Sequence, residues 1–567
     1  NFWKSCPHFI EIFFTGGSKV KKTRIVSLFL ASAMVISTLA GCGGGSSPTA
    51  AASAAGETTA AGGAAAAETT AAGNSAGSST EAKSIKDTLT LAAQTEPDTM
   101  DPCRGNGVSN NIIMNQVYDG LVRYNEDGTV EPRLATEWEQ IDDTHIRFKL
   151  REDVVFSNGS PFTAEDVLYS LARTKNDSTA ISTMSWYDPD TSVAEDDYTV
   201  VISMYQPYAP ALYVLAGGRT WIGDKETMEE MGEENYARNP VGTGAYALSE
   251  WVSGSSMLLT RNEKYWGEPA KTPNVRINFI AEEANRIIAL ETGEADLAYY
   301  IDGADAARVD EIDGYHAERG PSFSYYLICL AMDNEKFADK RVRHALAYAI
   351  DFKNLTDASF DGEATTLDGV YPNIAEGFKS EGIWEYNPEK AKELLAEAGY
   401  PDGFSCKLLS SSTYAMHEQT AVCVQSSLAE IGIKVELELP DWATRIERSN
   451  VGDYDMMVSG TTGNIVDMDW ATNYYESGDV RMNSCPGFAD DKIDELLQKG
   501  RTTLDEKERE EIYDQFRERA LELSPFVFIN FREQVFATAK NVHGFQNLDG
   551  ILTYLSGLTL QDTYVEE

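Results

Sequence analysis

The residue patterns that usually signal catalysis are incomplete in this sequence. His417-Glu418 begins the H-E-x-x-H pattern of zinc hydrolases, but Ala421 stands where the second histidine should be. The glycine-rich run at 242–247 leads to strand-like residues, whereas a dinucleotide site requires a helix there. The remaining histidines are not paired at metal-ligand spacing. We therefore expect no enzyme, no catalytic residue, no metal ligand and no cofactor.

One cysteine, Cys42, is the strongest candidate for covalent modification. It ends the run Leu39-Ala40-Gly41-Cys42, after a basic start at 20–24 and an apolar stretch at 25–39. This arrangement resembles the lipobox signals of exported bacterial lipoproteins, in which the cysteine carries the lipid. The resemblance implies a signal over residues 20–42 and lipidation at Cys42. Residues 1–19 do not fit such a signal, and we expect them to be upstream translation.

Residues 43–84 have the composition of a tether. Gly, Ala, Ser and Thr dominate the segment, which has no aromatic residue. Such a chain cannot bury enough apolar surface to offset the entropy lost on ordering. We expect it to be flexible and to hold the rest of the chain near a membrane. Its length favours a Gram-positive envelope over a periplasm.

Composition limits the classes of partner. The formal net charge is −43, which argues against binding to nucleic acid or to an anionic bilayer surface. After the signal, no run approaches 18 apolar residues, so no membrane-spanning helix is predicted. Five cysteines follow Cys42 at wide spacing, and we expect them to be buried. A disulfide between Cys406 and Cys423 is the alternative.

Strand-like and helix-like segments alternate along the rest of the chain, which indicates an α/β fold. Apolar residues alternate at 145–150, 199–205 and 275–280, as in strands with one covered face. Residues 325–332 are almost continuously apolar, which predicts a strand covered on both faces.

Helix boundaries are also marked. Asn387-Pro388 should begin a helix that Gly399 ends. Thr503 and Glu506 have the spacing of a capping box before a helix ending near Leu523. A short amphipathic helix is predicted over 491–499, with Gly500 as its stop.

Several stretches, in this order, resemble one family. Because of these stretches, the chain over residues 86–560 resembles family 5 of the extracytoplasmic solute-binding proteins, which serve peptide- and nickel-type ABC importers. The stretches that carry the resemblance are 116–128, 132–138, 148–167, 239–246, 261–266, 293–297, 337–346, 391–400 and 454–455.

The resemblance implies a two-lobed α/β fold like that of type II periplasmic binding proteins, with an extra β-rich subdomain in lobe I. Lobe I would comprise residues 85–325 and 538–567, with the insertion at 126–240. Lobe II would comprise residues 326–537. Such a protein closes around its ligand by hinge motion. We expect a monomer.

In peptide-binding members of the family, a carboxylate after the strand that begins Tyr454-Asp455 binds the peptide ammonium. In this sequence that position falls on Asn464, and the neighbouring aromatic position falls on Thr461. Asn464 offers no charge to an ammonium. Asp467 or Asp469 could replace the missing carboxylate, with Trp470 stacking on the ligand. Alternatively, both acids are ordinary loop residues and Trp470 is a core residue.

Two further segments are candidates for ligand contact. The residues Asn106, Gly107, Val108 and Ser109 match the first ligand-facing loop of the family, where glycine would let the backbone approach a ligand. Tyr325 and Tyr326 begin the strand that enters lobe II and could line the cleft. The alternatives are a plain turn and two core aromatics.

The resemblance therefore implies a lipid-anchored receptor outside the cytoplasm. It would capture oligopeptides or dipeptides and deliver them to an ABC permease and its ATPase. An oligosaccharide or a metal chelate are alternative ligands. A secreted hydrolase, or an adhesin without an import partner, are alternatives of another class. The membrane would be reached through the lipid only.

Overall fold

The computed structural model describes residues 84–105, 108–178, 180, 182–301, 303–360, 362, 364–367, 369, 383–463, 465–551 and 554–567. The expected upstream segment, the signal with Cys42 and the tether up to residue 83 lie outside these ranges. Within them, no helix combines the length and the apolar character needed to cross a bilayer.

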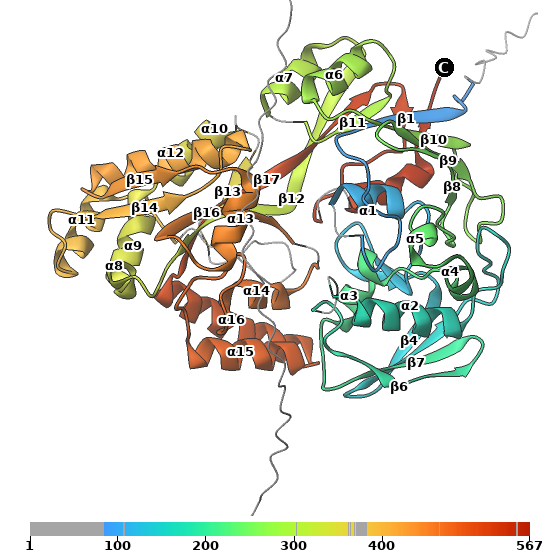
Figure 1. Ribbon diagram of the computed structural model, residues 1–567, viewed down its shortest axis with the longest axis horizontal. Helices are drawn as coiled ribbons and strands as arrows, with labels where there is room; N and C mark the ends of the chain where they lie inside the picture. The colour runs from blue at the N-terminus through green and yellow to red at the C-terminus, as the bar shows by residue number, and fades with distance from the viewer. Residues whose placement is uncertain are drawn as a thin grey trace, which may run out of the picture. The chain divides into compact units, whose positions relative to one another are not determined.

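Eleven of the described strands form one mixed sheet. In chain order they are β1 (Thr88–Ala93), β8 (Tyr246–Val252), β9 (Ser256–Arg261), β10 (Asn274–Phe279), β11 (Leu297–Tyr299), β12 (Tyr315–Leu330), β13 (Ala364–Thr366), β14 (Ser405–Leu409), β15 (Lys434–Glu438), β16 (Met456–Thr462) and β17 (Phe526–Ala539). Their order in the sheet is β15-β14-β16-β12-β17-β11-β1-β10-β9-β8, and β13 pairs with β17. β12 and β17 pair antiparallel along most of their lengths (Figure 1).

The long strands β12 and β17 join two parts of the described chain. We call the residues before β12 and after β17 lobe I, and the residues between these strands lobe II. β11 extends the sheet from β17 into lobe I, whereas β16 extends it from β12 into lobe II. The changes of lobe expected at 325/326 and at 537/538 fall inside β12 and β17.

Side chains alternate between two cores along the end of β12. Tyr325, Leu327 and Cys329 belong to the larger core, which also contains most of the buried apolar residues of lobe I. Tyr326, Ile328 and Leu330 belong to a second core with the helices of lobe II. Successive strand residues point to opposite faces, so a strand covered on both faces needs an unbroken apolar run. The predicted continuous run is therefore confirmed.

Lobe I carries three smaller sets of strands and its own helices. A four-stranded antiparallel sheet has the order β4-β5-β7-β6, and two pairs are formed by β2 with β3 and by β18 with β19. The strands are β2 (Val122–Tyr124), β3 (Val130–Pro132), β4 (Ala135–Asp142), β5 (His145–Leu150), β6 (Tyr187–Asp196), β7 (Thr199–Met204), β18 (Val542–His543) and β19 (Tyr564–Val565). The helices are α1 (Val108–Met114), α2 (Ala164–Asn176), α3 (Ala211–Leu215), η1 (Gly218–Thr220), α4 (Lys225–Met231), α5 (Glu233–Tyr236), α6 (Glu283–Glu291), α7 (Gly303–Glu311), α17 (Tyr554–Leu558) and η3 (Thr559–Asp562).

Lobe II is mainly helical around its strands (Figure 1). Its helices are α8 (Glu335–Ala338), α9 (Lys340–Ala349), α10 (Phe352–Phe360), α11 (Pro388–Glu397), α12 (Ala415–Glu430), α13 (Trp442–Asn450), η2 (Met468–Ala471), α14 (Thr472–Tyr475), α15 (Asp491–Thr502) and α16 (Glu506–Leu523). The second core unites α9, α10, α11 and α12 with β14 and β16.

The strands predicted from alternation are confirmed as β5, β7 and β10. In β5, Ile146, Phe148 and Leu150 are buried, whereas the residues between them are half-buried or exposed. The predicted helix after Asn387 is also confirmed. The Asn387 side chain accepts a hydrogen bond from the Lys390 N–H, Pro388 is the first helical residue, and Gly399 follows with a φ of 94°.

Two helix boundaries differ from the prediction. Gly500 does not end α15, which continues to Thr502. A Cβ on Gly500 would lie 2.6 Å from the Tyr513 ring, so this glycine lets α15 pack closely against α16. The prediction of a capping box that begins at Thr503 is also wrong. Thr503 caps the C-terminus of α15, and Asp505 instead caps α16 by accepting from the Glu508 N–H.

His417 is the most strongly perturbed histidine of lobe II. It is 3% exposed, and its ring centroid lies 5.0 Å from that of Tyr326 and 5.1 Å from that of Trp442. Burial and, to a smaller extent, the nearby Arg445 guanidinium lower the pKa of His417 to about 3. The imidazole is therefore neutral in the folded chain at neutral pH.

We expect this burial to make the protein less stable in acid. Between the unfolded pKa of 6.5 and the folded pKa of about 3, the unfolded state binds the extra proton. The free energy of unfolding should therefore fall by up to about 1.4 kcal/mol for each pH unit as pH decreases through this window. Urea unfolding of the wild type and of His417→Phe between pH 4 and pH 7 measures the difference.

The matched control is His145→Phe, at a partly exposed histidine on β5. His417→Phe should flatten the pH dependence, whereas His145→Phe should leave most of it. Equal slopes for the wild type and His417→Phe would contradict the assignment of this acid sensitivity to His417.

Candidate functional site

A small cavity lies where residues of both lobes meet. Its volume is about 60 Å³. Lobe I contributes residues from the start of α1, from the segment around η1 and from the start of α17, and lobe II contributes Ile465 after β16. The lining residues are Gly105, Asn111, Thr183, Val214, Gly217, Gly218, Arg219, Ile465, Ile551 and Tyr554. Ligand sites for small molecules usually enclose about 300 Å³ or more, so this cavity is smaller than such sites.

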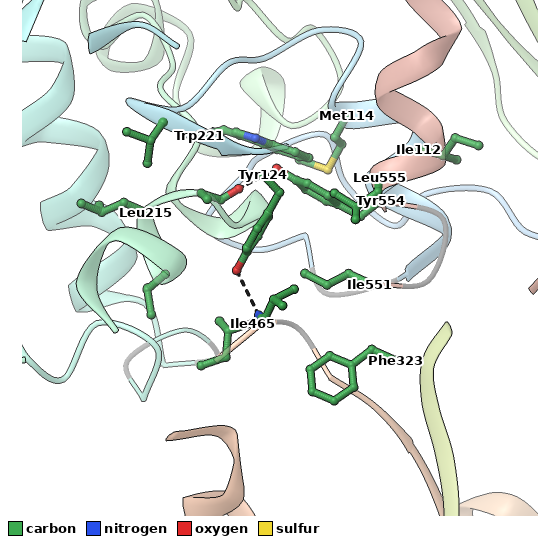
Figure 2. Packing of buried hydrophobic residues seen from close by; sticks show 14 of the residues in the cluster. Ile112, Met114, Tyr124, Leu215, Trp221, Phe323, Ile465, Ile551, Tyr554 and Leu555 are labelled. Atoms are coloured by element: carbon green, nitrogen blue, oxygen red, sulfur yellow. Dashed lines mark hydrogen bonds between the residues drawn. The ribbon is translucent and has the colours of Figure 1, made fainter. Parts of the chain in front are cut away.

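Aromatic side chains surround one side of the cavity. The Trp221 and Tyr554 rings are stacked with centroids 5.8 Å apart, and Tyr124 meets Tyr554 edge-on at 5.9 Å (Figure 2). The Tyr554 hydroxyl donates to the Ala216 carbonyl at 2.6 Å. These contacts fix the aromatic groups against one another, so this side of the cavity is a rigid wall.

Backbone atoms of lobe II bind directly to lobe I. The Val466 N–H donates to the Tyr124 hydroxyl at 3.2 Å, and the same hydroxyl donates to the Tyr213 carbonyl at 2.7 Å (Figure 2). The Ala209 N–H donates to the Arg501 carbonyl at the end of α15, at 2.8 Å. The segment after β16 and the end of α15 are therefore both held against lobe I.

Arg219 is the charged residue among the lining residues of this cavity. Its guanidinium donates to the Cys103 carbonyl at 3.4 Å. Burial lowers the pKa of Arg219, and the negative charge of Asp177 opposes this shift. The described lining contains no carboxylate. The cavity is therefore suited to an anionic group of a ligand.

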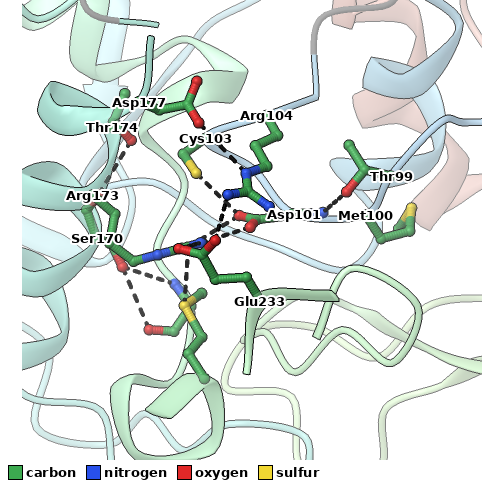
Figure 3. A network of polar contacts seen from close by, with 12 residues as sticks. Thr99, Met100, Asp101, Cys103, Arg104, Ser170, Arg173, Thr174, Asp177 and Glu233 are labelled. Carbon is green, nitrogen blue, oxygen red and sulfur yellow. Dashed lines mark hydrogen bonds and ion pairs between the residues drawn. The ribbon is translucent and has the colours of Figure 1, made fainter. Parts of the chain in front are cut away.

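A network of ion pairs fixes the turn that brings Gly105 to the cavity. The buried Asp101 carboxylate accepts from both terminal nitrogens of Arg173 on α2, at 3.0 and 2.6 Å. Arg104 pairs with Asp177 at 3.4 Å and also with Glu233 on α5 (Figure 3). Buried arginine–carboxylate pairs with two hydrogen bonds hold a fixed geometry. The turn before α1 is thus attached to two helices of lobe I.

On lobe II, the two candidate acids already have arginine partners. Asp467 accepts two hydrogen bonds from Arg509 on α16, at 2.5 and 2.7 Å. Asp469 accepts from the Arg501 Nε, with distances of 3.1 and 3.2 Å to its two oxygens. Burial raises the pKa of Asp469 to about 6, and the Arg501 charge opposes this shift. A ligand ammonium at either acid would have to share its carboxylate with an arginine.

The structure brings several other candidates together beside these acids. The Trp470 indole N–H donates to the Tyr325 hydroxyl at 2.7 Å, and that hydroxyl also bonds to the Tyr474 hydroxyl. Thr461 is the register partner of Tyr325 on β16. Tyr325 is fully buried. This group supports the segment that carries Asp467 and Asp469.

Tyr326 does not join this group. It points to the other face of β12, where it packs against Phe360 with ring centroids 4.8 Å apart. The candidates Asn106, Gly107 and Asn464 lie outside the described residues, as does the side-chain placement of Val108 and Ser109 at the start of α1. Their neighbours Gly105 and Ile465 line the same cavity.

Sequence reasoning did not single out Arg219, Tyr124 or Tyr554. Tyr124 lies in the stretch 116–128 that carries the family resemblance, but nothing local marks it as a contact between lobes. Gly217-Gly218 directly before Arg219 is the one sequence signal that could have indicated a close approach to a ligand.

A sheet shared by two lobes, with a cavity between them, defines a two-lobed binding protein of the periplasmic type. The family model described as bacterial extracellular solute-binding proteins, family 5 Middle, matches residues 129–483. The chain therefore belongs to family 5 of these solute-binding proteins, and the fold expected from the resemblance is confirmed.

Individual relatives agree with this assignment. The glutathione-binding protein GsiB of Escherichia coli O1:K1 / APEC is 28% identical over 469 residues, which cover 81% of this chain and 91% of GsiB. The PBP AgaA from A. tumefaciens R10, solved in complex with agropinic acid, is 35% identical with a TM-score of 0.72, covering 85% of this chain and 99% of AgaA. DppA from Helicobacter pylori, solved with the peptide STSA, is 25% identical with a TM-score of 0.70, covering 85% of this chain and 99% of DppA.

We expect the Asp467–Arg509 pair to be essential for the stability of lobe II. Arg509→Met would leave the buried Asp467 carboxylate without its counter-charge, which costs about 3–5 kcal/mol. Urea unfolding measures this loss. The control on the same helix is Lys507→Met, because Lys507 lies on the exposed surface of α16. That change should cost about 1 kcal/mol or less. Equal losses for the two variants would contradict a buried, structural role for Arg509.

Proposed function

We propose that this chain is a lipid-anchored receptor outside the cytoplasm, which captures oligopeptides or dipeptides and delivers them to the permease of an ABC importer. Family membership and the cavity between the lobes support this proposal. In this receptor, residues 20–42 are the signal, 43–84 the tether, 85–325 with 538–567 lobe I, and 326–537 lobe II. It acts as a monomer without catalysis of its own.

The observation that bears most on the ligand is the charge of the cavity lining. Arg219 offers a guanidinium to an anion, whereas the described lining offers no carboxylate to an ammonium. Asp467 and Asp469 are held by Arg509 and Arg501. A peptide would therefore be held mainly through its carboxylate and its main chain, with the ammonium free to vary.

The same observation favours a second candidate ligand, a small organic acid rather than a free peptide. AgaA was solved with agropinic acid, and GsiB is named for glutathione binding. Such a ligand would place a carboxylate at Arg219 and would not need an acid in place of Asn464. Oligosaccharides and metal chelates stay in the test as further alternatives.

A ligand panel distinguishes these candidates. The segment Glu81–Glu567, refolded to remove carried ligand, would be melted with di- to pentapeptides, the same peptides N-acetylated, glutathione, agropinic acid, cello-oligosaccharides, and nickel with and without chelators. A ligand at one hundred times its Kd should stabilise the protein by about 2.7 kcal/mol. Stabilisation by peptides supports the peptide receptor. Stabilisation by agropinic acid alone, or by a sugar or chelate alone, would replace peptides with that class.

Arg219→Gln tests how an anionic ligand is bound. Losing a charge-assisted hydrogen bond costs about 1.5–3 kcal/mol, so the Kd of the stabilising ligand should rise about tenfold to hundredfold. Arg219→Lys should recover part of this loss. Arg276→Gln on β10, away from the cavity lining, is the control. An unchanged Kd for Arg219→Gln would remove Arg219 from the site.

Lipidation has its own test. In a bacterial host that processes lipoproteins, the full chain should take up an alkyne-labelled fatty acid and sediment with membranes. Cys42→Ala should abolish the label and release the protein, whereas the control Cys423→Ala should change neither. Labelling that persists in Cys42→Ala would exclude Cys42 as the anchor.

A further inference from the structure

Two cysteines lie close together in the larger buried core. Cys329 lies on β12 and Cys485 lies between α14 and α15, and the two are 0% and 4% exposed. Both side chains belong to the larger core. The Cys485 thiol also donates to the Pro525 carbonyl at 3.0 Å, and the same oxygen accepts from the Leu330 N–H at 3.3 Å. The Cys485 sulfur therefore lies against the peptide that joins Cys329 to Leu330.

The segment that carries Cys485 is held on both sides of this contact. The Tyr454 hydroxyl donates to the Ser484 carbonyl at 2.8 Å, and the Met332 N–H donates to the Pro486 carbonyl at 2.6 Å. The Asn483 carbonyl lies 4.0 Å from the Cys329 sulfur. Each cysteine therefore lies beside the backbone that carries the other, and neighbouring contacts hold both segments in place.

The other described cysteines have different surroundings. The Cys103 thiol donates to the Asp101 carboxylate at 3.3 Å, and Cys423 accepts from the Ser359 hydroxyl at 3.8 Å. Cys406 is buried on β14. All five are free thiols in this structure, including Cys406 and Cys423, which the sequence left as a possible pair. Cys329 and Cys485 are the pair that the described contacts bring together.

We propose that Cys329 and Cys485 form a disulfide when the chain meets a low-molecular-weight disulfide such as oxidised glutathione. One cysteine thiolate attacks the external disulfide, forms a mixed disulfide and releases one external thiol. The second cysteine thiolate then attacks the protein sulfur of the mixed disulfide and releases the second external thiol. The two cysteines are oxidised by two electrons, and the external disulfide is reduced.

Burial determines when this exchange occurs. Burial and the neighbouring Cys329 raise the pKa of the Cys485 thiol well above its usual value. Because the thiolate is the reacting species, exchange is slow while the native core is closed. The bond forms during folding or refolding, when both cysteines are accessible, and native packing then protects it from reductants.

Peptide mapping of the full chain tests this proposal directly. The chain is refolded in a glutathione redox buffer, its free thiols are alkylated, and it is digested without reduction for mass spectrometry. The expected product is a linked peptide pair containing Cys329 and Cys485, with the Tm raised by about 5 °C over the reduced chain. Native protein exposed to the same buffer should form this link at least tenfold more slowly.

Variants separate this pair from the other thiols. Cys329→Ala and Cys485→Ala should each abolish the linked peptide and the gain in Tm, whereas Cys423→Ala should keep both. The peptide map of the wild-type protein tests the proposal by itself, so a variant that fails to fold does not remove the test. Alkylation of both Cys329 and Cys485 in the refolded, oxidised wild type would overturn the proposal, as would a link from either cysteine to a different partner.

Discussion

The pairing of β12 with β17 is the constraint on which the rest of the structure depends. The single mixed sheet passes from one lobe to the other through these two strands. On one side β11 joins β17, and on the other side β16 joins β12. Side chains on the two faces of these strands therefore pack into different cores. Tyr325 packs into the larger core, and Tyr326 packs into the second core on the opposite face. The pairing has register shifts between Pro321 and Ser324 and between Tyr326 and Leu327. Such irregularities bend a strand, and here they fall where the two lobes join.

Charged residues near the site act mainly on the backbone that surrounds it. Asp101 with Arg173 fixes the turn before α1, and Asp467 with Arg509 fixes the segment after β16. A buried pair of this kind costs desolvation energy but holds a defined geometry when its hydrogen bonds are made. Arg219 differs from these arginines because it lines the cavity. The chain is very acidic as a whole, yet the charged side chain in the described lining of this cavity is a cation.

Local patterns predicted the elements better than the site. The alternation of apolar residues predicted β5, and Asn387-Pro388 predicted the start of α11. Both features depend on residues that are neighbours in sequence. Gly500 was misread as a stop because its role is to admit the Tyr513 ring from another helix. Gly105 and Ile465, which are neighbours of predicted site residues, line one cavity. Their arginine partners and Tyr124 could not be predicted, because long-range packing places them.

Lobe II contributes main-chain groups to two of the hydrogen bonds that hold it against lobe I, one of which ends at the Tyr124 hydroxyl. The Val466 N–H and the Arg501 carbonyl make the hydrogen bonds to lobe I, and both belong to the main chain. Side chains at these positions can therefore be exchanged without removing the bonds that hold the closed form. Ligand preference and closure are in this sense separable traits. A lineage could retune the pocket for a new nutrient, one side chain at a time, while these main-chain bonds between the lobes stay the same.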